Sequence, residues 1–129
     1  MSSRPPLSKG ELEVARVLWQ IGPAGVRQVH ETLVTERAMD FATVQTYLRR
    51  LESKGYASSK LQGRIRVYSA RAKARTVIRQ TVDDFVDRLF GGESLPLVKH
   101  LIEEGGIDKE DLSELKALID RLETEETDS

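Results

Sequence analysis

Hydrophobic residues between Asp40 and Ser53 recur at the i, i+3, i+4 and i+7 spacing of a helix stripe that faces a protein core. The stripe consists of Val44, Tyr47, Leu48 and Leu51. The opposite side is almost free of acids and consists of Ala42, Gln45, Thr46, Arg49 and Ser53, with Thr43 and Arg50 at its edges. Such a side is either an ordinary solvated face or the surface of a helix that reads base edges and holds phosphates in a major groove. The pattern predicts a helix with Asp40 as its N-cap, and leaves the role of its polar side open.

Two shorter helices are predicted before this one. Ser8 and Glu11 have the spacing of a reciprocal capping pair, so the first helix should run from Lys9 to Gln20. A turn rich in glycine and proline ends it, and a second helix should follow from Val26 to Thr35. A polar connection, residues 35–40, then leads to the third helix. The residues expected to face inward are Leu12, Ala15, Leu18, Trp19, Val26, Val29 and Leu33.

After the third helix the hydrophobic period changes from 3.6 to 2, which predicts two short strands. They are Ala57–Leu61 and Ile65–Ser69, joined by a tight turn at Gln62-Gly63. The basic residues at or near the tip of this hairpin are Lys60, Arg64 and Arg66. Three helices followed by a basic hairpin is the order of a winged helix, whose third helix enters the major groove while the hairpin lies along the backbone. This order favours nucleic-acid binding over a plain solvated helix.

The remaining sequence predicts three more amphipathic helices. The first runs from Arg71 to Phe90, and its apolar residues are spaced as in a seam between helices. Ser94 is expected to cap a short helix that ends at Glu104, and Asp108 to cap a last helix, which leaves an acidic frayed tail at residues 123–129.

Helices of this size do not bury their apolar stripes well alone. We therefore expect the same helices of a second copy to complete the core, with packing on the basic half of the chain as the alternative. The predicted dimer contacts are Ile78, Val82, Phe85, Leu89, Leu112, Leu115, Ile119 and Leu122.

These elements predict a mainly α fold with a small β-hairpin. It comprises an N-terminal winged helix-turn-helix DNA-binding domain at residues 1–70 and a C-terminal helical dimerisation domain with an acidic tail at residues 71–129. Charge is divided in a similar way: residues 1–75 contain 14 Lys and Arg against 6 Asp and Glu, whereas residues 76–129 contain 6 against 15. The two halves either attract each other or have different partners. Clustering of the basic residues on particular elements favours a polyanion as the partner of the first half.

The amino-acid composition and the absence of certain motifs bear on which kinds of site and which cellular location we expect. The chain has no cysteine, which excludes disulfides, thiolate metal sites and a cysteine nucleophile. No apolar run approaches the roughly 18 residues of a membrane span, and the N-terminal residues lack the apolar core of a signal peptide, so we expect no membrane partner and a cytoplasmic location. His30 and His100 have no ligand spacing, and no phosphate loop or nucleophile elbow is present. We expect neither an enzyme nor a metal or cofactor site.

A family resemblance is carried by three segments, in this order: LSKGELEVARVLWQIGPAGVRQVHETL, TVQTYLRRLESKGY and SLPLVKHLIEEGGIDKEDLSELKALID. Together they resemble the penicillinase-repressor family, which includes the methicillin-resistance and copper-responsive repressors, from about Leu7 to Leu122. The resemblance implies a homodimeric winged-helix repressor that binds a palindromic operator in double-stranded DNA and occludes a promoter. It implies dimerisation through residues 71–122. By position it also implies that Thr43, Gln45 and Thr46 face bases, that Arg49 and Arg50 hold bases or phosphates, and that the hairpin arginines follow the backbone.

Three departures from the family pattern leave the inducing signal open. Members that sense β-lactams are inactivated by proteolysis at an Asn-Phe bond, where this chain has Val98-Lys99. Copper-responsive members carry cysteine pairs that are absent here. Some relatives have Lys and Arg in place of Ala42 and Gln45, which implies a different operator. Relief of repression by a sensor protease or by a small-molecule inducer therefore stays open.

Two functions other than DNA binding are also considered. One is a winged helix used only for protein contacts, and the other is a regulator that senses a small molecule between its helices. Protein contacts usually need exposed apolar anchors, whereas the polar side of the third helix offers Thr, Gln and Arg.

Overall fold

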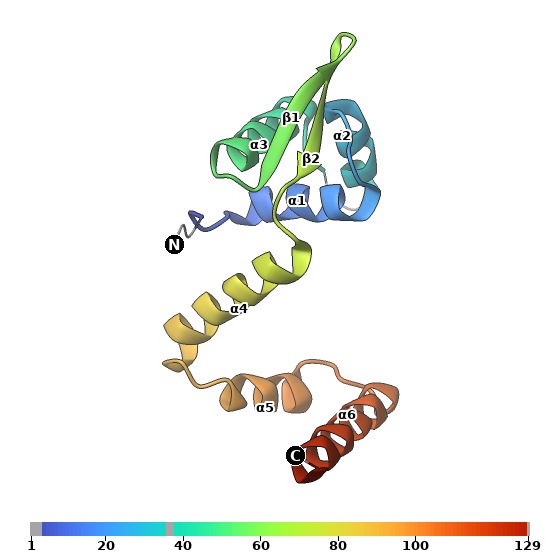
Figure 1. Ribbon diagram of the computed structural model, residues 1–129. Coiled ribbons are helices and arrows are strands. Elements are labelled where there is room, and N and C mark those ends of the chain that lie inside the picture. Colours follow the sequence, from blue (N-terminus) through green and yellow to red (C-terminus); the bar gives the residue numbers. More distant parts are fainter. Residues whose placement is uncertain (1–3, 36–37, 129) are drawn as a thin grey trace. The chain divides into compact units, whose positions relative to one another are not determined.

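The computed structural model describes residues 4–35 and 38–128, and within these ranges the chain is mainly helical with one antiparallel hairpin (Figure 1). The predicted fold class is confirmed. Residues 36 and 37 of the predicted polar connection lie outside the described residues. The elements in chain order are α1 (Lys9–Ile21), α2 (Val26–Val34), α3 (Phe41–Ser53), β1 (Ala57–Gln62), β2 (Ile65–Ala70), α4 (Ala74–Phe90), α5 (Leu95–Glu104) and α6 (Lys109–Asp128).

The described residues divide into two compact units within α4. The first, which we call the winged-helix unit, ends at Thr81, and the second, the C-terminal unit, begins at Val82. This is a division by proximity of the backbone. The division of roles at residues 70 and 71 expected from the sequence stays a prediction.

The helices of the winged-helix unit begin where the sequence predicts. The backbone N–H of Ser8 donates to Glu11 Oε1 at 2.8 Å, and the N–H of Glu11 donates to Ser8 Oγ at 3.2 Å, which completes the predicted capping pair of α1. At the start of α3, the N–H of Thr43 donates to Asp40 Oδ1 at 2.9 Å. Side chains of this kind satisfy backbone donors that the first turn of a helix leaves unpaired.

One hydrophobic core joins α1, α2, α3 and the hairpin, and the predicted stripes face it. Its most deeply buried apolar residues are Val14, Val29, Val44, Leu48 and Leu51. The predicted inward residues Ala15, Leu18 and Leu33 are also buried, whereas Leu12, Trp19, Val26 and Tyr47 are partly buried against the core. The Tyr47 ring reaches α1 where Gly10 has no side chain, because a Cβ there would lie 2.5 Å from the ring. The sequence therefore identified the core-facing side of each of these helices.

Strands β1 and β2 form the wing, an antiparallel hairpin in which Ser59 pairs with Tyr68 and Gln62 pairs with Ile65. The two-residue turn lies at Gly63-Arg64, one residue later than predicted. Gly63 has φ 66°, which a glycine adopts at no steric cost in a short hairpin turn. A β-bridge between Ala24 and Tyr68 attaches β2 to the connection between α1 and α2.

Helix α4 begins at Ala74 rather than at the predicted Arg71. The backbone N–H groups of Arg71 and Ala72 both donate to the carbonyl of Tyr56, at 2.8 Å and 3.3 Å, so these residues continue from the hairpin instead of entering a helix. Trp19 Nε1 donates to the carbonyl of Ala72 at 3.0 Å. These bonds hold the segment before α4 on the winged-helix unit.

Two predictions about the helices after α4 were wrong in detail. Ser94 lies at the N-cap of α5 but has helical backbone angles, φ −83° and ψ −27°, and its side chain makes no cap hydrogen bond. The residues predicted as a frayed tail continue α6 to Asp128. Glutamate favours helix, and Arg121 pairs with Glu125 at 3.9 Å, one turn apart. The predicted cap of α6 is present, because the N–H of Asp111 donates to Asp108 Oδ1 at 2.8 Å.

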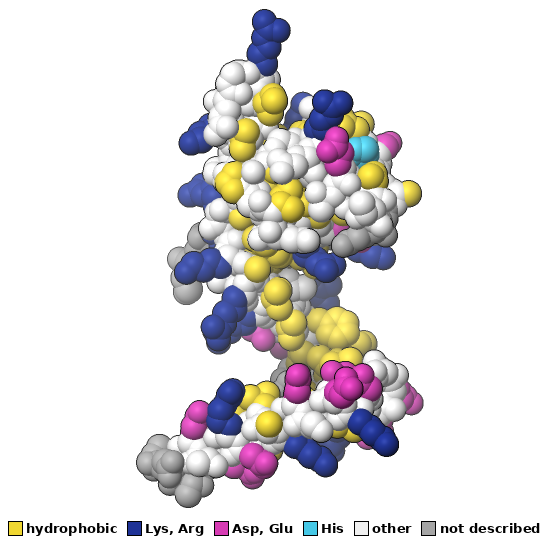
Figure 2. Space-filling model, turned by 90° about the vertical axis from the view of Figure 1, so that its right-hand side faces the viewer, with side chains coloured by type: hydrophobic (Ala, Val, Ile, Leu, Met, Phe, Trp, Pro, Cys, Tyr) yellow, Lys and Arg dark blue, Asp and Glu magenta, His cyan; other side chains and the backbone are white. Residues whose placement is uncertain are grey.

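The apolar seams of the last three helices are largely exposed in the single chain. Helix α5 has no buried residue. Hydrophobic side chains are visible at the surface in this part of the chain (Figure 2). Of the predicted dimer contacts, Leu115 is half-buried, and the exposed ones are Ile78, Val82, Phe85, Leu89, Leu112, Ile119 and Leu122.

Candidate nucleic-acid interface

The outward side of α3 consists of the residues that the sequence assigned to it. Ala42, Thr46, Arg49 and Arg50 are exposed, and Thr43 and Gln45 are half-buried. Because successive turns bring residues four apart onto one line, this side has two flanks. One faces a groove beside the wing, and the other faces a shallow depression on the far side of the helix.

The first flank carries Phe41, Gln45 and Arg49 in a row, and it borders a groove of about 840 Å³. We call this the wing groove. Beyond α3, the groove is lined mainly by the start of α2, with Arg27, Gln28 and Glu31, and by the wing, with Gln62, Arg64, Ile65 and Arg66. Four arginines against a single glutamate make the lining strongly basic, and Arg27 pairs with that glutamate at 3.6 Å. An anion is therefore the favoured occupant.

The second flank borders a depression of about 290 Å³ lined by Ala42, Thr43, Thr46, Tyr47 and Arg50. The guanidinium of Arg50 lies 5.8 Å from the centroid of the Tyr47 ring, within the range of a cation–π contact. The predicted DNA-contact residues of α3 are thus divided between two surfaces rather than gathered on one.

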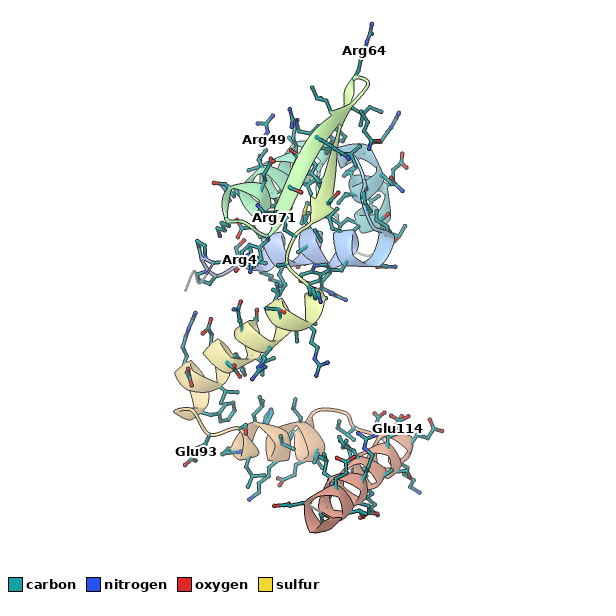
Figure 3. All side chains as sticks on the ribbon, in the orientation of Figure 1. Arg4, Arg49, Arg64, Arg71, Glu93 and Glu114 are labelled. Atoms are coloured by element: carbon teal, nitrogen blue, oxygen red, sulfur yellow. The ribbon has the colours of Figure 1, made fainter. Side chains whose placement is uncertain are left out.

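The basic residues of the wing are also separated. Leu61 pairs with Arg66 and Lys60 pairs with Val67, so Lys60 and Arg66 lie on opposite faces of the hairpin. Arg64 projects from the tip (Figure 3). Arg66 Nη1 donates to Ser59 Oγ at 3.0 Å, and Ser59 Oγ donates to Glu52 Oε2 at 2.7 Å, which links the wing to the last turn of α3.

The C-terminal end of α3 is held by an ion pair that sequence reasoning missed. Lys54 Nζ lies 2.6 Å from Glu11 Oε1, and the side chains are 27% and 2% exposed. Burial raises the pKa of Glu11, but hydrogen bonds from Lys54 and Ser8 and the charge of Lys54 outweigh it, so the pKa lies below its ordinary value. The pair fixes the end of α3 to the first turn of α1, and hence helps to orient the outward side of α3.

The N-terminal segment is attached to the same end of α3. Arg4 Nε donates to the carbonyl of Gly55 at 2.9 Å, and Lys54 Nζ donates to the carbonyl of Pro6 at 3.0 Å. The hydroxyl of Tyr56 donates to the carbonyl of Pro5, and the Arg4 guanidinium lies over the Tyr56 ring. Residues before α1 therefore take part in positioning α3.

The start of α3 is electrostatically fixed by its cap. Hydrogen bonds from the side chain and the backbone N–H of Thr43 lower the pKa of the Asp40 carboxyl. Asp40 therefore stays ionised near neutral pH. Its negative charge stabilises the helix because it lies at the positive end of the helix dipole.

The structure adds several residues to those predicted for this interface, among them Arg27, Gln28 and Phe41, which line the wing groove. For Arg27 the sequence offered a weak signal, since it is a basic residue at the start of α2. Phe41 gave none, because an apolar residue beside a helix cap is ordinarily a core residue.

The two histidines, possible metal-binding groups and possible membrane-spanning helices in the described ranges bear on catalytic and membrane functions. His30 lies against the Phe41 ring, and His100 Nδ1 lies 3.2 Å from Glu104 Oε2 within α5. Among the residues that the structure describes, no group of three or more His, Asp and Glu side chains is placed to bind a metal ion. No helix in the same ranges has both the length and the hydrophobicity needed to span a bilayer.

A family model described as penicillinase repressor matches residues 7–121, which is nearly the whole chain. The chain belongs to the penicillinase repressor family. The penicillinase repressor of Bacillus licheniformis is 27% identical over 120 residues, which cover 93% of this chain and 94% of that protein. The methicillin resistance regulatory protein MecI of Mammaliicoccus sciuri is 22% identical over 115 residues, covering 89% and 94%.

Solved structures agree with this membership. The solution structure of the DNA-binding domain of the repressor BlaI is 31% identical, with a TM-score of 0.51, and covers 57% of this chain and 90% of that chain. A probable transcriptional regulator from Pseudomonas aeruginosa is 18% identical, with a TM-score of 0.50 over 90% of this chain and 78% of that chain, and supports the fold alone. Penicillinase repressor family members are transcriptional repressors rather than enzymes, so this chain is a DNA-binding repressor and the prediction of no enzymatic activity is confirmed.

Proposed function

We propose that this repressor acts as a homodimer that recognises a palindromic operator, with α3 in the major groove and the wing along the phosphate backbone. The observation that carries the proposal is the exposed side of α3. It presents hydrogen-bonding and guanidinium side chains opposite the buried residues Val44, Leu48 and Leu51, and it borders a groove lined by four arginines. The residues proposed to contact DNA are Ala42, Thr43, Gln45, Thr46, Arg49, Arg50, Lys60, Arg64 and Arg66.

The chemistry of these side chains suits a duplex. A glutamine can bond both major-groove positions of adenine, and an arginine can do the same for guanine. Threonine hydroxyls donate or accept, and the remaining arginines suit phosphates. The winged-helix unit also contains most of the basic residues, whereas the helices after it carry most of the acids (Figure 2).

The dimer is supported by the unfilled seams of α4, α5 and α6. Apolar side chains in these seams are about half exposed; Val82, Phe85 and Ile119 are examples. Apolar surface on this scale is uncommon on a monomer, and covering it with the same helices of a second copy is the economical solution. A two-fold dimer presents two α3 helices and hence requires a site with matching symmetry.

Selection of bound duplexes from a random pool tests the function directly. A palindromic consensus is expected, with half-sites spaced by about one helical turn or a multiple of it. Affinity for that duplex should fall on the order of a thousandfold between about 50 and 200 mM salt if the dimer neutralises about six phosphates. A scrambled duplex of equal length serves as the control. Enrichment of no sequence, or of sites without two-fold symmetry, would contradict the proposal.

Two inducing signals fit this function, a sensor protease and a small-molecule ligand. Val98 and Lys99 lie within α5, and Val98 is exposed in the single chain. Mass spectrometry of the repressor before and after induction in cells separates the two. Cleavage yields a fragment that ends at or near Val98, whereas a ligand relieves repression with the chain intact.

A further inference from the structure

Two large apolar side chains are exposed in the lining of the basic wing groove, Ile65 on the wing and Phe41 at the first residue of α3. Phe41 is 46% exposed and lines the groove with Gln45 and Arg49. The same groove is lined by four arginines, which suits it to an anion. The ring therefore offers an apolar contact to a ligand that is otherwise charged.

The ring is held in place from two directions. Phe41 follows the cap residue Asp40, whose carbonyl accepts from the N–H of Val44 at 3.1 Å, so its backbone belongs to the first turn of α3. Its ring meets the ring of His30 in α2 edge to face, with centroids 5.8 Å apart and planes at 71°. Contacts of this geometry favour one ring orientation. Phe41 is thus presented to the groove as a fixed surface.

DNA offers one apolar group in its major groove, which is the C5-methyl of thymine. We propose that Phe41 reads a thymine of the operator by packing its ring on this methyl group, in line with the base contacted by Gln45. This inference rests on the proposed function of α3. Residues four apart on a helix are separated by about 6 Å along its axis, so the thymine should lie within about three base pairs of the position that Gln45 reads.

Replacement of thymine by uracil tests the contact because it removes only the methyl group. In the selected operator, each thymine is replaced by uracil in turn, and the affinity of the full-length protein is measured. One position per half-site should lose about fourfold in affinity, the value of one buried methyl group. In Phe41→Ala, thymine and uracil should bind equally at that position, while the preference at the Gln45 position is kept.

Val34→Ala is the matched control, because Val34 is 47% exposed, lies on α2 and is absent from the lining of the wing groove. This variant should keep the full difference between thymine and uracil. A Phe41→Ala protein that still distinguishes the two bases at every position would overturn the inference. A protein that selects no duplex at all would instead overturn the proposed function, and the inference with it.

Photochemical cross-linking provides a second measurement that needs no variant. An operator with 5-iodouracil at the sensitive position carries iodine in place of the methyl group. On irradiation, the cross-linked peptide identified by mass spectrometry should contain Phe41. Cross-linking to Tyr47 or to a residue of the wing instead would assign the methyl contact elsewhere and overturn the inference.

Discussion

The guanidinium of Arg50 lies over the ring of Tyr47, 5.8 Å from its centroid. Its sequence neighbour Arg49 lines the wing groove instead. Two adjacent arginines of α3 thus occupy different surroundings. A guanidinium held on an aromatic ring at the edge of a helix is suited to a phosphate, and one beside a glutamine in a groove is suited to a base.

Separate replacement of these arginines should have different effects. Arg49→Ala should relax the preference at one guanine position, at a cost of about 1 to 3 kcal/mol on the operator. Arg50→Ala should weaken binding to all duplexes alike and lower the salt slope by about 1. Titrations of operator and scrambled duplexes at several salt concentrations measure both effects. Arg50→Lys is the control and should keep most of the slope, and exchanged behaviour of the two variants would reverse the assignment.

Gln45→Ala should change sequence preference more than overall affinity. The amide is neutral and contributes nothing to counterion release, so the salt slope should stay as in the parent protein. One base position should lose its preference, because the bonds to the base edge are removed. Repeated selection from the random pool with the variant reveals the changed position. An unchanged consensus would remove Gln45 from the set of base contacts.

A charge placed on the seam of α4 should prevent dimerisation. Val82 is 46% exposed in the single chain, and in a dimer Val82→Glu would bury a carboxylate without a partner. Gln80→Glu adds the same charge to the same helix at an exposed polar position and is the matched control. Sedimentation equilibrium at micromolar concentration should give a monomer for Val82→Glu and a dimer for Gln80→Glu. A monomeric parent protein would contradict the dimer itself.

Loss of Lys54 should destabilise the winged-helix unit markedly. Glu11 is 1% exposed, so Lys54→Ala leaves a buried carboxylate without its cation, at a cost of about 3 to 5 kcal/mol. Lys60→Ala removes the same side chain from an exposed position of the wing and should change the free energy of unfolding by less than about 0.5 kcal/mol. Urea unfolding followed by circular dichroism compares the two. Equal midpoints would show that the pair contributes little.

The same pair predicts a dependence of stability on pH. The pKa of Glu11 in the folded protein lies below its ordinary value of 4.5, so the unfolded chain binds its proton first as the pH falls. The stabilisation from Glu11 is therefore fully present above pH 4.5 and is lost as the pH falls through the lowered pKa. Urea midpoints of the parent and Glu11→Gln, measured between pH 7 and pH 3, should converge at the acidic end. A constant difference over this range would contradict the lowered pKa.

The predictable part of the fold rests on interactions between residues close in sequence. The Ser8–Glu11 cap and the apolar stripe of α3 are of this kind, and each follows from the spacing of its residues along one helix. The Glu11–Lys54 pair joins residues 43 positions apart, and no local spacing indicates it. The start of α4 was also predicted wrongly because of a contact distant in sequence. The backbone N–H of Arg71 donates to the carbonyl of Tyr56 and not to a neighbour within a helix.

The candidate site was predictable in its residue types and less so in its arrangement. Helical projection correctly separated the outward residues of α3 from Val44 and Leu48. It could not show that the flank with Gln45 and Arg49 borders a groove, because that depends on where the wing lies. Phe41 was overlooked because hydrophobicity alone does not distinguish a core residue from one that faces a groove.

The bonds of Arg4, Pro5 and Pro6 to residues 54–56 have a practical consequence for work with this repressor. A proline-containing leader ahead of the first helix invites trimming when a shorter protein is prepared for crystallisation or NMR. Trimming here would remove acceptors for the side chains of Lys54 and Tyr56. A shortened protein would then report the DNA affinity of a loosened α3 rather than that of the intact molecule.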